Sequence, residues 1–204
     1  MLVGVLSSLS DDQKSWISST GFGSIISFEL KEYPVKLSEF MLSSFEPNPS
    51  VLKINEIFFE IAEEDVHEIM GLPREPEDVG FVNNVLVKKG WGEIFGPAKQ
   101  CYQVTAAKLC NFISSNKAVI NQFKMNFMVL FSNVLIEGSS TPYVNTNMVE
   151  FAGDFDSCKK YNWCRYLIQY LQEQFVIWNQ NRERRFFKGS LAFLMVRVIE
   201  LLFF

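Results

Sequence analysis

The sequence predicts a mainly α-helical globular domain with a small β-hairpin near residues 51–61. Of its 204 residues, 48% are hydrophobic and 15% are aromatic, which is enough apolar surface for a sizeable core. Most of the chain carries apolar residues at intervals of three and four, the spacing of a buried helix face. One short stretch instead combines β-branched and aromatic residues, a composition typical of strands.

The first third of the chain contains the clearest change of period. Residues 51–61 are mainly β-branched and aromatic around the polar pair Asn55-Glu56, which predicts two short strands joined by a tight turn. From Glu63 onward the apolar residues recur at helical spacing, and three acids occupy the first turn, where the helix dipole favours negative charge. Gly71 then ends this predicted helix.

The remaining elements are predicted from caps, apolar spacing and helix breakers. We expect helices over residues 10–17, 35–45, 105–115, 119–136, 147–152, 156–181 and 190–204, and one strand over residues 81–87. The segment 119–136 is apolar on most sides and is therefore expected in the middle of the core. The aromatic stripe from Trp163 to Trp178 favours core packing over a base-stacking platform, because it follows helical spacing.

Two parts of the chain are distinguished. Residues 1–34 are expected to form a peripheral segment, and residues 35–204 to form the helical domain. The chain ends on the apolar run LLFF, whereas C-termini usually carry polar residues at the surface. We therefore expect either a truncated gene product or a segment excised from a longer one.

Composition argues against several classes of protein. The formal net charge is −4, so the chain has no global attraction to nucleic acid or anionic lipid. Its four cysteines are far apart and it has one histidine, so neither a zinc site nor a disulfide framework is predicted. These cysteines are expected to be reduced thiols of an intracellular protein, and no cofactor is expected.

Membrane insertion and secretion are not predicted. The N-terminus has no basic leader and soon reaches Asp11 and Asp12, which argues against a signal peptide. The two most apolar segments, residues 119–136 and 191–204, are interrupted by polar or charged residues, so they fit buried helices better than membrane spans.

Known catalytic and metal-binding patterns do not predict an enzyme. His67-Glu68 resembles the start of a zinc-protease HExxH motif, but Gly71 stands where the second histidine belongs. The acids at the start of the predicted helix fan out around its axis, which favours a solvated face over a metal site. We therefore expect a non-enzymatic protein with no catalytic, cofactor-binding or metal-binding residues.

One basic cluster is the candidate interaction site, formed by Arg182, Arg184, Arg185 and Lys188. Such a cluster has three interpretations: contacts to phosphates, contacts to an acidic partner, or a solvated junction between helices. Nucleic-acid binding is the alternative function, and the net acidity of the chain argues against it.

Several short motifs resemble one plant family. They are FEPNPSVLKI (residues 45–54), EDVH (64–67), GLP (71–73), FSNVLIE (131–137), YVN (143–145), NWC (162–164) and FKGSLAFL (187–194). Together they are similar to the aminotransferase-like plant mobile domain and to transposon-derived plant proteins related to the segment that precedes ubiquitin-like-protease domains. The resemblance runs from about Lys36 to the end of the chain.

The resemblance implies a nuclear, transposon-derived plant protein linked to transposon silencing or development, including meristem maintenance, or a gene remnant. The family has no established catalytic residue to carry over, and the protease residues of its longer relatives are missing here. Ala62 departs from the family pattern, which has a Ser or Thr cap at this position. The predicted function is a protein-interaction module with an unknown partner, located in the nucleus, with the cytoplasm as the alternative.

Overall fold

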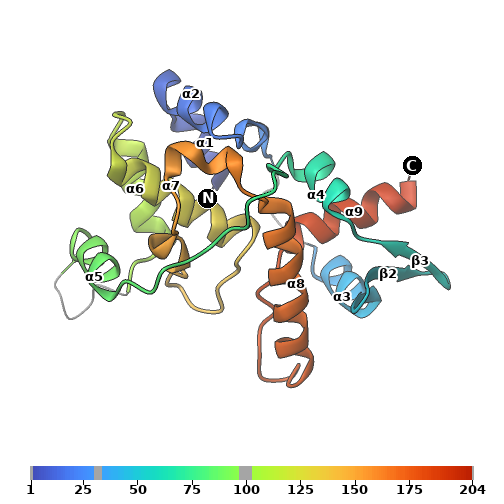
Figure 1. Ribbon diagram of the computed structural model, residues 1–204. Helices are drawn as coiled ribbons and strands as arrows, with labels where there is room; N and C mark the ends of the chain where they lie inside the picture. The colour runs from blue at the N-terminus through green and yellow to red at the C-terminus, as the bar shows by residue number, and fades with distance from the viewer. Residues whose placement is uncertain (1, 30–33, 97–102, 204) are drawn as a thin grey trace.

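The fold class predicted from the sequence is confirmed. The computed structural model describes residues 2–29, 34–96 and 103–203, and within them α-helices surround one hydrophobic core with a small antiparallel sheet at its side (Figure 1). The α-helices are α1 (Leu2–Ser8), α2 (Asp11–Ser19), α3 (Val35–Ser44), α4 (Glu63–Met70), α5 (Val85–Glu93), α6 (Ala106–Ser115), α7 (Asn121–Leu135), α8 (Trp163–Asn179) and α9 (Leu191–Phe203). Short 3-10 helices are η1 (Gly23–Ser27), η3 (Asn147–Glu150) and η4 (Phe155–Lys160).

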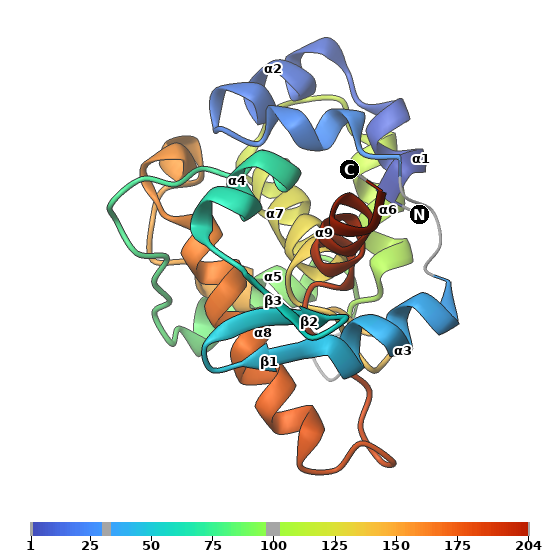
Figure 2. The ribbon, with the colours of Figure 1, turned by 90° about the vertical axis from the view of Figure 1, so that its right-hand side faces the viewer.

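Helix α7 is the centre of the core, as its all-round apolar character predicts. Three of its phenylalanines, Phe123, Phe127 and Phe131, are fully buried. Helices α1, α6 and α9 contact it, and Figures 1 and 2 show it enclosed by other elements in both views. A helix that is apolar on most sides is stable only when neighbours cover each of those sides.

The sheet has the order β1-β2-β3, with β1 (Phe45–Pro47), β2 (Ser50–Ile54) and β3 (Ile57–Glu60). The predicted hairpin is β2-β3, and its turn residues Asn55 and Glu56 have φ of 49° and 64°. Positive φ at both central residues is typical of the type I′ turn, whose twist matches that of paired strands. The sequence does not predict strand β1, because Pro47, its last residue, and the nearby Pro49 indicate the end of a helix rather than an edge strand.

The described part of the N-terminal segment, residues 2–29, packs into the core, although the sequence predicts a peripheral segment over residues 1–34. Trp16, Ile17 and Phe22 are buried in the same core as α7. The ring of Phe22 lies 4.9 Å from that of Phe131 on α7, and the ring of Trp16 lies 5.5 Å from that of Phe123. The sequence does not predict this packing, because these apolar residues fall in a short helix and a glycine-bounded turn, which carry no long periodic signal.

The strand predicted over residues 81–87 is also wrong, because helix α5 begins at Val85. The Asn84 side chain accepts a hydrogen bond from the Val87 N–H at 3.1 Å and caps this helix. Trp91 anchors α5 to α7, since it is buried and its Nε1 donates to Asn126 Oδ1 at 2.8 Å. The alternating apolar pattern in this stretch does not face the core, because Val82 and Leu86 are both exposed.

The aromatic stripe of residues 163–178 is confirmed as mainly core, but its helix begins later than predicted. Residues Phe155–Lys160 form the 3-10 helix η4, and α8 begins at Trp163. Asn162 determines this start, because its Oδ1 accepts from the Arg165 N–H at 2.8 Å. Similarly, the helix predicted over residues 147–152 is the short 3-10 helix η3.

Within the described residues, none of the helices has both the length and the hydropathy needed to cross a lipid bilayer. The apolar α9 is instead packed into the core through Phe193, Leu194 and Val198, which are fully buried. Burial in the core therefore accounts for its apolar sequence.

Candidate interaction surface

The C-terminal half of α8 and the chain that returns from it project beyond the rest of the molecule (Figure 1). We call residues 172–188 the α8 tip. Aromatic rings hold the tip in place: Phe175 packs on Phe45 of β1 at 5.1 Å and on Trp178 at 5.5 Å. The returning chain adds Phe187, whose ring lies 5.9 Å from that of Trp178. The tip is therefore an ordered surface and not a loose loop.

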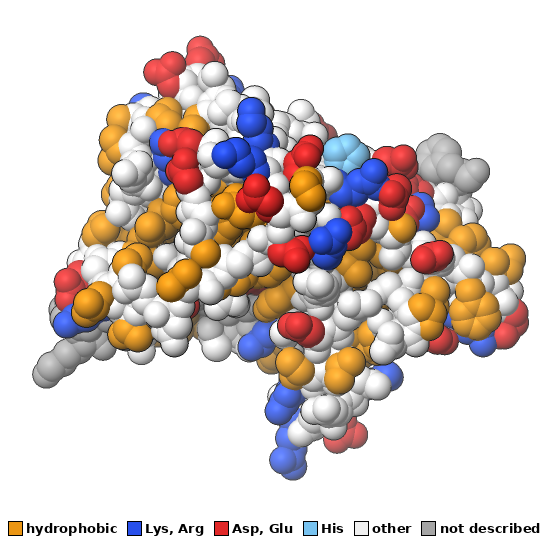
Figure 3. Space-filling model, viewed as in Figure 1, with side chains coloured by type: hydrophobic (Ala, Val, Ile, Leu, Met, Phe, Trp, Pro, Cys, Tyr) orange, Lys and Arg blue, Asp and Glu red, His pale blue; other side chains and the backbone are white. Residues whose placement is uncertain are grey.

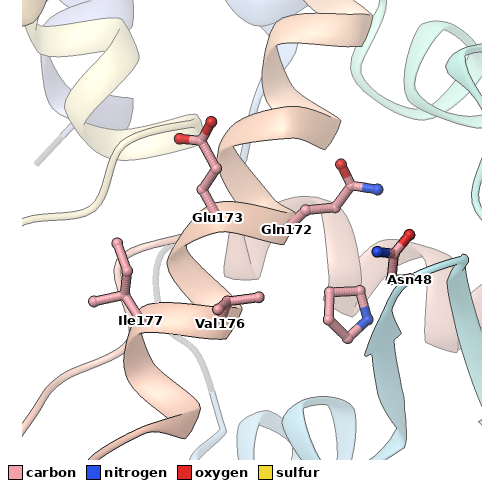
Figure 4. Close-up of a pocket in the computed structure, with 6 residues that line it drawn as sticks. Asn48, Gln172, Glu173, Val176 and Ile177 are labelled. Carbon is pink, nitrogen blue, oxygen red and sulfur yellow. The ribbon is translucent and has the colours of Figure 1, made fainter.

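A first pocket of about 430 Å³ separates the tip from the β1–β2 turn. Its lining residues are Pro47, Asn48, Gln172, Glu173, Val176 and Ile177. Figure 4 shows the side chains of Gln172 and Val176 extending from α8 toward Asn48. Gln172 also donates to Ser50 Oγ at 2.7 Å, which fixes one wall of the pocket against β2.

The apolar part of this pocket is open to solvent. Val176 is 48% exposed and Ile177 is 40% exposed, although each is a large aliphatic side chain. They lie outside the buried stripe of α8, which runs through Trp163, Leu167 and Leu171. Neighbouring apolar side chains that are exposed beside a pocket are typical of an interaction site.

The predicted basic cluster lies at the end of the α8 tip, beside a second pocket of about 380 Å³. Arg182, Arg184 and Arg185 are exposed and Lys188 is half-buried. Figure 3 shows Lys and Arg side chains gathered at this projecting end, with hydrophobic side chains next to them. Among residues 2–29, 34–96 and 103–203, no acidic group lies within the 4.0 Å ion-pair distance of these four cations.

Contacts inside the tip position two of these cations. The Arg182 guanidinium lies over the Trp178 ring, 4.8 Å from its centroid, which is a cation–π geometry. Arg185 Nη1 lies 3.5 Å from the carbonyl oxygen of Ile177. Arg184 makes no side-chain hydrogen bond within the described part of the chain, so its charge is available to a partner. Phe186, 75% exposed, completes the second pocket.

A third, more polar pocket of about 520 Å³ lies between the tip and residues 138–147. The three pockets share lining residues: Ile177 belongs to the first and second, Glu173 to the first and third, and Lys188 to the second and third. They therefore adjoin one another around the α8 tip.

A buried carboxyl stands behind the third pocket. The Tyr166 hydroxyl donates to Glu137 Oε1, whereas Glu137 Oε2 has no hydrogen-bond partner among the described residues. Burial raises the pKa of Glu137 above its ordinary value, against the opposing effect of hydrogen bonds from Tyr166 and others. Burial also raises the pKa of Tyr166, so its hydroxyl keeps its proton. This pair connects the end of α7 to α8 and supports the tip from inside.

His67 and the two buried cysteines, Cys158 and Cys164, are the next groups to place. His67 is exposed, and its Nδ1 lies 2.7 Å from the Leu72 carbonyl oxygen, just beyond the end of α4. Cys158 and Cys164 are buried, and desolvation raises the pKa of each thiol to about 12. Thiols with such a pKa carry almost no thiolate at neutral pH and are poor nucleophiles.

The acids of α4 do not converge, and the prediction of a solvated face holds for Glu64 and Glu68, which are exposed, but not for Glu63 and Asp65, which are half-buried; the three acids of the first turn are all paired. Each pairs with a different arginine, namely Glu63 with Arg165 at 2.8 Å, Glu64 with Arg74, and Asp65 with Arg197 at 2.6 Å. These pairs connect α4 to α8, to the segment after α4 and to α9. The first turn of α4 is therefore a junction between elements.

Sequence reasoning finds the cations of the surface but misses its apolar part. Val176 and Ile177 lie next to residues of the buried stripe of α8 in the sequence. The spacing of apolar residues alone does not show which of them face solvent, so it does not separate these two from the stripe. Phe186 carries a usable signal, because it is an aromatic residue directly after four charged or polar positions. Nothing in the sequence indicates that Pro47 lines a pocket with α8, since its position beside that helix depends on the tertiary fold.

Comparisons with known proteins give one match. A family model described as a domain of unknown function, DUF8566, matches residues 1–195, which covers nearly the whole chain. Searches of curated proteins and of solved structures found no match.

Proposed function

The chain belongs to the DUF8566 family, and from the geometry of its surface we propose that it is a non-enzymatic protein-interaction module whose contact surface is the α8 tip. One observation carries the proposal. On one projecting element, the tip combines exposed apolar side chains with adjoining pockets. It also carries cations that have no acidic partner among the described residues. Aromatic residues and arginine are enriched in protein interfaces, and the tip exposes Phe186 beside Arg184 and Arg185.

The surrounding structure supports a binding role. The tip is held against the sheet by the Phe175–Phe45 contact to β1 and by the Gln172–Ser50 hydrogen bond to β2. A surface that is already ordered loses little conformational entropy when a partner binds. A rigid projecting surface therefore favours recognition of a partner over closure around a small substrate.

The biological setting is proposed from the resemblance to plant mobile-domain and transposon-derived proteins. In that setting the module acts in the nucleus, in transposon silencing or development, and the partner is another nuclear protein. Imaging of the fluorescently tagged chain in plant cells tests this part: nuclear fluorescence agrees with the proposal, and exclusion from the nucleus contradicts it.

Nucleic-acid binding through Arg182, Arg184, Arg185 and Lys188 is the second candidate, because exposed cations suit phosphates. Two observations make it the weaker one. The chain has a net charge of −4, and Glu173 and Glu183 interrupt the cations on the same tip. Titration of a labelled oligonucleotide at several salt concentrations tests it, since phosphate contacts give a steep salt dependence.

Photo-crosslinking from the tip tests the interaction-module proposal directly. A photoreactive amino acid replaces Ile177 in the full chain, and a matched variant carries it at Leu86, which is also apolar and exposed but lies on α5. We expect a protein adduct from position 177 in plant nuclear extract and none from position 86. Equal crosslinking from both positions, or none from position 177, contradicts the proposal.

A further inference from the structure

The chemistry of the α8 tip indicates what kind of segment it binds. Its first pocket offers Pro47, Val176 and Ile177 as an apolar contact, with the amides of Asn48 and Gln172 beside them. A pocket of about 430 Å³ accommodates one or two apolar side chains. The amides are suited to the backbone N–H and C=O groups of an extended or turning peptide.

The cations of the α8 tip indicate which charged groups the ligand carries beside its apolar side chain. Arg184, Arg185 and Lys188 line the second pocket, and each lacks an acidic partner within the part of the chain that the structure describes. Other arginines of this protein are paired, as Arg165 and Arg197 show. Arginine binds carboxylates through a planar fork of donors, so unpaired arginines beside a pocket favour a ligand that supplies carboxylates.

The apolar and basic parts lie close enough for one short segment to reach both. Ile177 lines the first and second pockets, and the Arg185 guanidinium lies 3.5 Å from its carbonyl oxygen. Because an extended peptide advances about 3.3 Å per residue, one short segment can place an apolar side chain in the first pocket and a carboxylate in the adjoining second pocket. Glu173, one helical turn before Ile177 on the same face of α8, disfavours acids in the first pocket.

We propose that the α8 tip binds an acidic peptide segment of another protein, with one aliphatic or aromatic side chain in the pocket between Pro47 and Val176 and its carboxylates on Arg184 and Arg185. This inference rests on the proposed function and names its partner class. Phe186, exposed beside the arginines, contributes a second apolar contact to the same segment.

Selection from a displayed library of random dodecapeptides, with the full chain as bait, tests the proposal without a known partner. We expect the selected peptides to be enriched in Asp and Glu around one large apolar residue. Fluorescence polarisation then measures their affinity for the chain and for its variants. Selected peptides without an excess of acids, or no selected peptides at all, overturn the inference.

Two pairs of variants locate the contact. Arg184→Glu with Arg185→Glu reverses the tip charge, and its control, Lys159→Glu with Lys160→Glu, makes the same change at two exposed lysines of η4. We expect the tip variant to weaken binding by at least about tenfold, the usual effect of losing an interface hot spot. We expect the control to change it by less than about twofold, because distant exposed charges are screened by salt.

A second pair of variants tests the apolar contact. Val176→Asp places a charge in the first pocket, and Val85→Asp places the same charge at an exposed valine on α5. Both substitutions are at exposed positions, so circular dichroism is expected to show folded protein for each. Binding that survives Val176→Asp, or that falls equally with Val85→Asp, overturns the assignment of the pocket.

Two other occupants are separate outcomes. An oligonucleotide that binds with the same dependence on Arg184 and Arg185, while acidic peptides do not, overturns the inference in favour of nucleic acid. Concentration-dependent dimerisation abolished by the same variant assigns the surface to a second copy, whose hairpin exposes Ile57 and Phe58 beside Glu56. If acidic peptides fail but crosslinking from Ile177 still captures a protein, the partner class is wrong and the interaction module stands.

Discussion

At the scale of single residues, Trp163 is a buried side chain on which several elements converge. Its ring is fully buried and lies 5.2 Å from that of Phe22 and 6.4 Å from that of Phe131. Its Nε1 donates to the Cys158 carbonyl oxygen at 2.8 Å, so its one polar atom is satisfied. It therefore joins the N-terminal segment, α7, η4 and α8.

Trp163→Ala is expected to destabilise the fold by about 3–5 kcal/mol, because it removes a large buried ring and leaves a cavity. Urea denaturation followed by circular dichroism measures the loss. Trp178→Ala serves as the control, since Trp178 is only half-buried at the α8 tip, and its cost is expected to be smaller. Equal losses for the two variants would show that Trp163 is not the central contact.

Gly71 is a residue whose backbone excludes other side chains. Its φ is +63°, and a Cβ at this position would overlap the Ser24 side chain. Gly71→Ala is therefore expected to destabilise the protein by more than about 1 kcal/mol. Gly90→Ala is the matched control: Gly90 lies inside α5, where a Cβ would point into open space, so alanine there is expected to stabilise by about 0.5–1 kcal/mol.

Both glycine variants are compared by thermal denaturation. Gly71→Ala is expected to lower the melting temperature, and Gly90→Ala is expected to raise it. A fall for Gly90→Ala as large as that for Gly71→Ala would contradict the structural reason, because the two positions would then be equally restrictive.

Glu137 makes stability depend on pH. Burial raises the pKa of its carboxyl in the folded state above the value in the unfolded chain, so the folded state binds the proton more tightly. Its contribution to stability is therefore present at acid pH and is lost as pH rises from the ordinary carboxyl range through the raised pKa. Glu137→Gln is neutral at every pH, and this loss is expected to be absent from the variant.

The free energy of unfolding of both proteins, measured by urea titration from about pH 4 to about pH 8, tests this prediction. As pH rises, the free energy of unfolding of Glu137→Gln is expected to increase relative to that of the original protein. Glu173→Gln, at an exposed carboxylate of the α8 tip, is the control and is expected to keep the original pH dependence. Parallel curves for the original protein and Glu137→Gln would contradict the prediction.

At the scale of elements, α4 has an incomplete N-terminal cap. The Ala62 N–H donates to Asp65 Oδ2 at 2.7 Å, which is one half of a capping box, but Ala62 has no side-chain oxygen for the other half. The helix is stabilised by its ion pairs to other elements, including Asp65 with Arg197 at 2.6 Å, where both side chains are mostly buried. Tertiary contacts therefore compensate for a weak local signal.

Ala62→Ser completes the capping box and is expected to stabilise the protein by about 0.5–1 kcal/mol, because the serine oxygen accepts one free N–H of the first turn. Thermal and urea denaturation measure the gain. Ala62→Gly is the control, since glycine adds no acceptor. A gain no larger for serine than for glycine would contradict the capping explanation.

At the scale of the whole molecule, the N-terminal segment is part of the single core. Trp16 and Ile17 are buried against α7, and Trp16 Nε1 contributes a hydrogen bond to Asp156 Oδ1 of η4. Gln13 is fully buried, and its Nε2 donates to the Asn116 carbonyl oxygen at 2.8 Å. Residues distant in sequence thus satisfy both the apolar and the polar groups of this segment.

A chain that begins at Val35 is therefore expected to lose cooperative unfolding, because removal of the earlier residues exposes the phenylalanines of α7. Calorimetry and binding of a hydrophobic dye test this prediction. Ile17→Ala in the full chain is the milder comparison, with an expected cost of about 2–5 kcal/mol. A shortened chain that melts cooperatively at the original temperature would contradict the single-core description.

Neighbouring residues alone are sufficient to predict the elements whose signals are local. The β2-β3 hairpin, the acidic start of α4, the all-round apolar α7 and the buried stripe of α8 all follow from such signals. They are predictable because periodicity, turn chemistry and capping act over a few residues. The cations at Arg182 and Arg184 are found for the same reason, as closely spaced charges need no tertiary information.

Other features depend on distant contacts and follow only from the packing of the whole chain. Helix α5 is fixed on the core because Trp91 docks on Asn126, and the N-terminal segment is buried because it packs against α7. The candidate site depends on the same kind of contact, since Pro47 and Val176 line one pocket although they lie far apart in sequence. The sequence shows which side chains are apolar or charged. Only the packing of whole elements determines which of these side chains lie exposed next to one another, because that depends on contacts between distant residues.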